Sequence, residues 1–158
     1  MQPLTATRFE LTTDWTLDAP LTRVWAELSA PDQWPQWWRA VKRVELVLPG
    51  DASGIGAVRR FTWATALPYQ ITFDMRATRI EPERVIEGEA RGELNGTGTW
   101  TLTPAGSGTH VRYDWRVDLS LAWQRTLAPV LRPVFAWNHT VVMGWGEEGI
   151  RRRLGIAA

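Results

Sequence analysis

The sequence contains no cysteine and almost no lysine. Its 158 residues include two histidines and eighteen basic residues, of which Lys42 alone is a lysine. The absence of cysteine excludes disulfides, a thiolate nucleophile and cysteine-ligated zinc, and it suits a reducing compartment. We therefore expect a cytoplasmic protein. The scarcity of lysine beside so many arginines is attributed to the base composition of the gene rather than to function.

An excess of charge and a long apolar run are missing as well. Eighteen basic residues nearly balance seventeen acidic ones, for a net charge of +1. Nucleic-acid-binding proteins usually carry a strong basic excess on one face, so no nucleic-acid partner is expected. No run approaches the roughly 18 apolar residues of a membrane-spanning helix, and MQPLTATRFE has no apolar signal core. We expect a soluble protein without a membrane span.

Three kinds of catalytic or metal site are not encoded either. The stretch GDASGIG lacks the GK[ST] of a phosphate-binding loop and precedes a predicted strand. Ser53 does not lie in a G-x-S-x-G motif. His110 and His139 fall on different predicted elements without carboxylates at ligand spacing, so we expect no metal and no other cofactor.

Among the residues that are present, the eleven tryptophans are unusual. Each indole buries roughly 150–250 Å² and usually needs a partner for its N–H group. This is more aromatic surface than a core of this size needs, so some tryptophans are expected to line a cavity or a protein interface. The length favours one domain over residues 1–158.

The hydrophobic pattern predicts strands and helices in a definite order. Period-two alternation predicts a strand over residues 8–17, and apolar residues at helical spacing predict a helix over 18–28 and a short one over 32–40. Six further strands are predicted over residues 41–48, 57–65, 70–80, 84–94, 96–104 and 109–119. In the first of these six, Val44, Leu46 and Leu48 share one face.

The last third of the chain predicts a long helix from about residue 127 to 154. Pro133 indicates either a kink in it or a later start. An antiparallel sheet with one apolar face must cover that face, and this helix is the element long enough to do so. We therefore predict an α+β fold: a curved sheet of about seven strands wrapped around the C-terminal helix, with two short helices closing one end.

Four segments carry a family resemblance: DAPLTRVWAELSAPDQWPQWW, PGDASGIGAVRR, GEARGELNGTGTW and FAWNHTVVMGWGEEGIRRRL. In this order they resemble the helix-grip superfamily, which includes START lipid-transfer domains, pollen-allergen-type ligand carriers and bacterial polyketide cyclases. The bacterial polyketide cyclase/dehydrase-and-lipid-transport type is the most similar, and the resemblance covers nearly the whole chain. It implies a helix-grip fold and a hydrophobic ligand, with catalysis in some members, although fold analogy alone does not assign a function.

Two polar residues interrupt the apolar arc of the predicted C-terminal helix. At about 100° per residue, Asn138 and His139 lie in or beside the arc that Val142 shares and Met143 borders. A buried polar group without a partner costs about 1–3 kcal/mol, so both need one. They are either satisfied core residues or polar contacts in a ligand cavity. His139 as a general base is a third interpretation, with no acidic partner at helical spacing.

The strand over 84–94 supports a cavity independently, because Gly88, Ala90 and Gly92 on one face are small. Such residues leave space opposite a long helix, or they let the sheet bend around it. The predicted ligand-binding residues are Phe73, Met75, Ala90, Trp100, Tyr113, Trp115, Asn138, His139, Val142 and Met143.

The arginines allow two interpretations each. Alternation places either Arg59 or Arg60 toward the interior, as a carboxylate- or enolate-binding group or as a solvated rim residue. The run 151–153 near the end of the last helix complements the helix dipole or meets an anionic partner.

Three functions follow from these observations. The main hypothesis is a carrier or sensor that binds a polyketide, a lipid or an isoprenoid-like molecule. The second is a cyclase or dehydratase acting on a polyketide-like substrate, in which His139, the candidate catalytic residue, or Asn138, Tyr113 or an arginine orients an enolate. The third is a protein-interaction module that uses exposed tryptophans of the stretch WPQWW.

Overall fold

Seven antiparallel strands form one sheet in the computed structural model, which describes residues 7–119 and 126–157. The strands are β1 (Thr7–Leu17), β2 (Val41–Leu48), β3 (Val58–Ala64), β4 (Gln70–Glu81), β5 (Val85–Gly92), β6 (Gly96–Ala105) and β7 (Gly108–Leu119). The helices are α1 (Leu21–Leu28), the short 3-10 helix η1 (Pro31–Gln36) and α3 (Ala128–Leu154).

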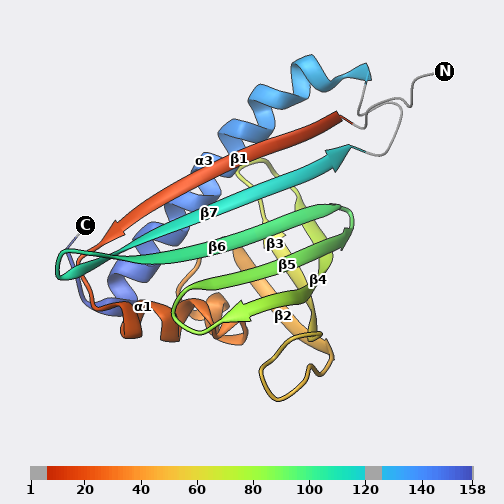
Figure 1. Cartoon of the computed structure of the whole chain (residues 1–158). Helices are drawn as coiled ribbons and strands as arrows, with labels where there is room; N and C mark the ends of the chain where they lie inside the picture. Colours follow the sequence, from red (N-terminus) through yellow and green to blue (C-terminus); the bar gives the residue numbers. More distant parts are fainter. Residues whose placement is uncertain (1–6, 120–125, 158) are drawn as a thin grey trace.

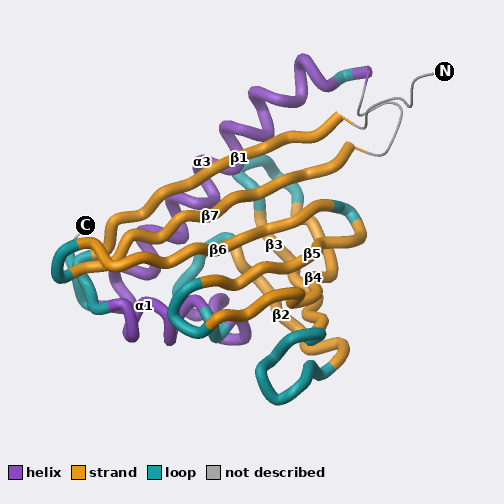
Figure 2. The backbone as a smooth tube through the Cα atoms, viewed as in Figure 1, coloured by secondary structure: helices purple, strands orange, loops and turns teal. Residues whose placement is uncertain are grey.

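The sheet order is β1-β7-β6-β5-β4-β3-β2, so β2 to β7 form a meander and β1 pairs with the last strand. Figure 1 shows the sheet curving around α3, with α1 below it. In Figure 2, α1 lies beyond the end of β1, where the chain leaves the sheet. The predicted α+β helix-grip architecture is confirmed. None of the helices in residues 7–119 and 126–157 is long and apolar enough to cross a membrane.

The second short helix is present with different bounds. It is the 3-10 helix Pro31–Gln36 rather than a helix over 32–40, because the backbone leaves the helical conformation at Trp37, where φ is -130°. In β2, whose Val44, Leu46 and Leu48 alternate as expected for a strand, Leu46 and Leu48 are 55% and 50% exposed. Because β2 is the edge strand, the elements that cover Val41 at its beginning do not extend over its end.

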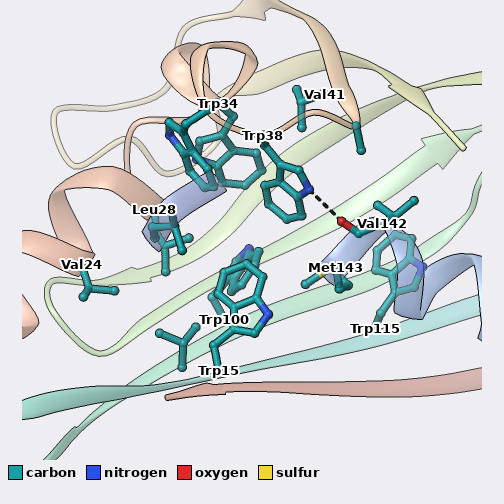
Figure 3. Close-up of a cluster of buried hydrophobic side chains, with 14 of the residues drawn as sticks. Trp15, Val24, Leu28, Trp34, Trp38, Val41, Trp100, Trp115, Val142 and Met143 are labelled. Carbon is teal, nitrogen blue, oxygen red and sulfur yellow. Dashed lines mark hydrogen bonds between the residues drawn. The ribbon is translucent and has the colours of Figure 1, made fainter. Parts of the chain in front are cut away.

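A pair of tryptophans after η1 fixes the C-terminal half of α3. The fully buried Trp38 donates a hydrogen bond from Nε1 to the carbonyl oxygen of Val142 at 2.9 Å (Figure 3). A Cβ at Gly146 would lie 2.5 Å from the Trp38 ring, and one at Gly149 would overlap the carbonyl oxygen of Trp37. Gly146 and Gly149 together form a glycine notch, and the two indoles can approach the helix because the notch has no side chains.

The tryptophans of WPQWW are therefore core residues. Trp34, Trp37 and Trp38 are 8%, 5% and 0% exposed, and the Trp38 ring lies 5.8 Å from that of Trp15 and 6.0 Å from that of Trp100. The hypothesis of an interaction surface built from these exposed tryptophans is wrong. The glycine notch, which no periodic pattern reveals, provides the space that buries them.

The helix α3 packs closest to one edge of the sheet, against β1. The rings of Phe135 and Phe9 meet edge to face with centroids 5.4 Å apart. The helix starts at Ala128 and continues through Pro133, which agrees with the predicted range and removes the later start. Near its end, Arg151 donates to the carbonyl oxygen of Thr16 at 2.7 Å, which gives this arginine a structural partner.

The glycine notch predicts opposite effects for two alanine substitutions in α3. Gly149→Ala places a methyl group against the Trp37 backbone, which cannot rotate away, and should lower the free energy of unfolding by about 1–3 kcal/mol. The matched control is Gly144→Ala in the same helix, where a Cβ meets nothing within 4 Å. It should raise that free energy by up to about 1 kcal/mol. Denaturant unfolding of both variants measures the difference, and equal stabilities would contradict the notch.

Candidate ligand-binding cavity

A cavity of about 1060 Å³ lies between α3 and the concave face of the sheet. The helix α3 packs closest to β1 at one edge of the sheet, and the cavity lies between α3 and the strands farther from that edge. Apolar side chains dominate the wall, among them Leu11 of β1, Trp25 of α1, Ile71 of β4 and Leu131 of α3. The cavity is therefore suited to a ligand with mostly apolar surface.

Nine of the ten predicted ligand-binding residues lie on the cavity wall. They are Phe73, Met75, Trp100, Tyr113, Trp115, Asn138, His139, Val142 and Met143. Ala90 is not on this wall: it is 1% exposed and packed into the core. Its register partner on β4 is Met75, whose long side chain forms the wall at this point. Contact of the nine residues with a ligand stays a prediction.

Glycines of β5 and β6 line the cavity, and each has a large side chain packed against it. Gly88 and Gly98 are register partners. A Cβ at Gly88 would lie 2.7 Å from the sulfur of Met75, and one at Gly98 would overlap the Tyr113 hydroxyl. The glycines thus allow these two large side chains to lie close against the sheet. Because both side chains lie close to the strands, they line the cavity without filling it.

Asn138 has a structural partner and also lines the cavity. Its Oδ1 accepts a hydrogen bond from the backbone N–H of Ala66 at 2.7 Å. Ala66 lies in the turn between β3 and β4, so this bond attaches the turn to α3 across the cavity. The two interpretations of Asn138 from the sequence, a satisfied residue and a cavity residue, therefore apply together.

His139 contacts Tyr113 and has an unpartnered nitrogen. The two rings are nearly parallel, with centroids 6.4 Å apart and an interplanar angle of 12°. Nε2 of His139 is buried and has no hydrogen-bond partner among the residues that the structure describes. Burial lowers the pKa of His139 to about 4, and it raises the pKa of Tyr113 above its usual value. At neutral pH the histidine is therefore uncharged and the tyrosine keeps its proton.

In β3, Arg59 faces the cavity and Arg60 faces outward. Arg59 shares the inward face with Phe61 and lines the cavity, where it forms two hydrogen bonds of 3.0 Å to the carboxylate of Asp32 in η1. Arg60 faces outward and pairs with Asp74. Arg59 is thus a rim residue whose charge is already neutralised. Within the described ranges no three potential metal-ligating side chains of His, Asp or Glu converge.

Sequence reasoning missed several wall residues. Trp63 of β3 lines the cavity, and its Nε1 is buried without a partner. The alternation with Phe61 was a signal for its inward direction. Leu67 and Tyr69 line the cavity from the turn between β3 and β4, where no periodic pattern could have identified them.

The family model described as polyketide cyclase / dehydrase and lipid transport matches residues 8–155. No curated protein matches the chain. A START superfamily protein from Mycobacterium smegmatis superposes with a TM-score of 0.76 at 13% identity, covering 92% of this chain and 97% of that one.

Two further solved structures have the same fold. The protein TTHA0849 from Thermus thermophilus has a TM-score of 0.75 at 17% identity, with 92% of this chain and 99% of that chain covered. Zhui aromatase/cyclase from Streptomyces sp. R1128 has a TM-score of 0.74 at 14% identity, with 94% of each chain covered.

The low pKa of His139 predicts a loss of stability in mild acid. The unfolded chain binds a proton at this residue near pH 6.5, whereas the folded chain does so only near pH 4. The contribution of uncharged His139 to the free energy of unfolding is therefore fully present above pH 6.5. As the pH falls toward 4, the free energy of unfolding decreases by up to about 1.4 kcal/mol per pH unit. The measurement is the unfolding free energy of the wild type minus that of His139→Gln, since the subtraction cancels other titrating groups. A difference that does not change with pH would show that His139 is well solvated.

Proposed function

We propose, because the chain belongs to the polyketide cyclase / dehydrase and lipid transport family, that it binds a hydrophobic small molecule between α3 and the sheet. The observation that carries this proposal is the cavity of about 1060 Å³ with a mainly apolar wall. Ligand sites for small molecules typically span about 300–1,000 Å³, so a multi-ring or long-chain molecule fits here. The protein then acts as a carrier or a sensor.

The wall chemistry supports an apolar ligand. Phe73, Trp100 and Trp115 present aromatic rings from three different strands. Burial of apolar surface contributes about 25 cal/mol per Å², so a ligand that fills such a wall gains most of its affinity without polar contacts. A polyketide, a lipid or an isoprenoid-like molecule meets this requirement. Cytoplasmic action without a nucleic-acid partner belongs to the same proposal.

The cyclase or dehydratase alternative has one structural observation in its favour, the adjacency of His139 and Tyr113 on the cavity wall. Proton transfer requires a base and an acid whose pKa values lie near the working pH. Burial moves both groups away from this range, since it lowers the pKa of His139 and raises that of Tyr113. These pKa shifts favour binding over catalysis.

A substitution that fills the cavity tests the proposed binding. Ala77 of β4 lines the cavity, whereas its neighbour Arg76 faces solvent. Ala77→Trp should weaken the binding of Nile red, an uncharged apolar dye, by at least about tenfold, because the indole occupies the ligand volume. Arg76→Trp adds the same indole outside and should leave the affinity unchanged. Dye fluorescence titration measures both.

The outcomes of this titration separate binding in the cavity from adhesion to the surface. Equal affinity in both variants would place the dye outside the cavity and overturn the proposal. Native mass spectrometry of the protein purified from its own host provides the second measurement. The wild type should carry an apolar compound that the Ala77→Trp variant lacks.

A further inference from the structure

The orientation of the Asn138 amide determines what this residue offers a ligand. Its oxygen is engaged by the N–H of Ala66 at 2.7 Å, which also fixes which end of the amide is oxygen. The NH₂ group is then the remaining polar end of a side chain that lines the cavity. Within residues 7–119 and 126–157, Nδ2 makes no hydrogen bond that would occupy it. Asn138 therefore acts toward a ligand as a hydrogen-bond donor.

Two further polar groups on the wall can donate a hydrogen bond as well. The Tyr113 hydroxyl lies over Gly98 on the cavity wall and makes no hydrogen bond to another described residue. Its proton is retained because burial raises the pKa, so the hydroxyl can also donate. Trp63 adds a buried indole N–H that bonds to none of residues 7–119 and 126–157. These groups are matched by oxygen acceptors on a ligand.

The charges around the cavity do not favour an anion. Arg59 is the one arginine or lysine on the wall among the described residues. Its Nε and Nη2 both donate hydrogen bonds to the carboxylate of Asp32. Three carboxylates, those of Glu87, Glu93 and Asp118, also border the cavity. An ionised ligand would lose its hydration and gain no unpaired counter-charge, which is costly in an apolar site.

We propose that the cavity selects hydrophobic molecules bearing an uncharged carbonyl oxygen, which accepts a hydrogen bond from the Asn138 amide, with the Tyr113 hydroxyl as a second donor. Carboxylates of the same shape are rejected. This inference rests on the proposed function and adds the chemical class of the ligand. It assigns Asn138 two roles, since one end of the amide holds the turn between β3 and β4 and the other end meets the ligand.

Three probes of nearly equal shape test the selection: 2-acetylanthracene, 2-isopropenylanthracene and anthracene-2-carboxylate. They present a carbonyl oxygen, a methylene group and a carboxylate at the same position. The quantity measured is the affinity for the ketone divided by that for the alkene, from fluorescence titration. Because the ratio compares isosteres, it isolates the contribution of the oxygen. The carboxylate should bind the wild type more weakly than either neutral probe.

The decisive variant is Asn138→Asp, measured at about pH 8 so that the carboxyl group is ionised. It keeps an oxygen for the Ala66 N–H and replaces the donor by an acceptor. The ketone-to-alkene ratio should fall by about five- to tenfold, the contribution of one hydrogen bond. Thr140→Asp adds the same charge on the exposed side of α3 and should keep the wild-type ratio. Tyr113→Phe retains the ring and should lower the ratio about threefold, which tests the inference even if Asn138→Asp fails to fold.

Each result has a definite meaning. If the neutral probes bind but the ratio is the same in the wild type, Asn138→Asp and Tyr113→Phe, the inferred selection is overturned while the proposed function stands. Tightest binding of the carboxylate would overturn it as well. If no probe binds the wild type, the proposed function fails and the inference fails with it.

Discussion

The structure depends on the contact of Trp37 and Trp38 with the glycine notch of α3. Trp38 reaches the carbonyl oxygen of Val142 only because Gly146 is beneath its ring, and Gly149 admits the backbone of Trp37. Two glycines in a helix cost about 2 kcal/mol in helix propensity. The burial of two tryptophans offsets this cost, since each removes roughly 150–250 Å² from water. The junction fixes the C-terminal half of α3, while the N-terminal half packs on Phe9 of β1.

The cavity is a consequence of this placement. A helix held at its end by tryptophans packs closest to β1, so the cavity lies between this helix and the strands farther from β1. Glycines in β5 and β6 then keep Met75 and Tyr113 flat against the strands. The wall is mainly apolar because the apolar faces of the strands, which elsewhere form the core, also face the cavity. Its polar groups include Asn138 and His139 of α3 and Tyr113 of β7. Asn138 is held in position by a backbone N–H rather than by another side chain.

The sequence predicted the elements whose burial is periodic. Alternation placed all seven strands of the described sheet, and helical spacing placed α1 and α3. It failed where burial depends on a distant partner. Leu46 and Leu48 alternate like core residues but lie on an uncovered edge. Trp37 and Trp38 looked available for a partner protein because the notch that receives them is more than a hundred residues away. The Asn138 position was predicted, whereas its partner Ala66 was not, since a turn has no period.

The tryptophan cluster also gives the molecule an optical property. The rings of Trp15, Trp34, Trp38, Trp63 and Trp100 form a connected set, with neighbouring centroids between 4.8 and 6.1 Å apart. At such separations an excited indole passes its energy to the next ring much faster than it emits light. The set therefore behaves as one antenna, and three of its members border the cavity. A ligand that absorbs at the wavelength of indole emission and binds in the cavity would quench the fluorescence of the whole cluster. Ligand binding could then be followed by intrinsic tryptophan fluorescence, without a label.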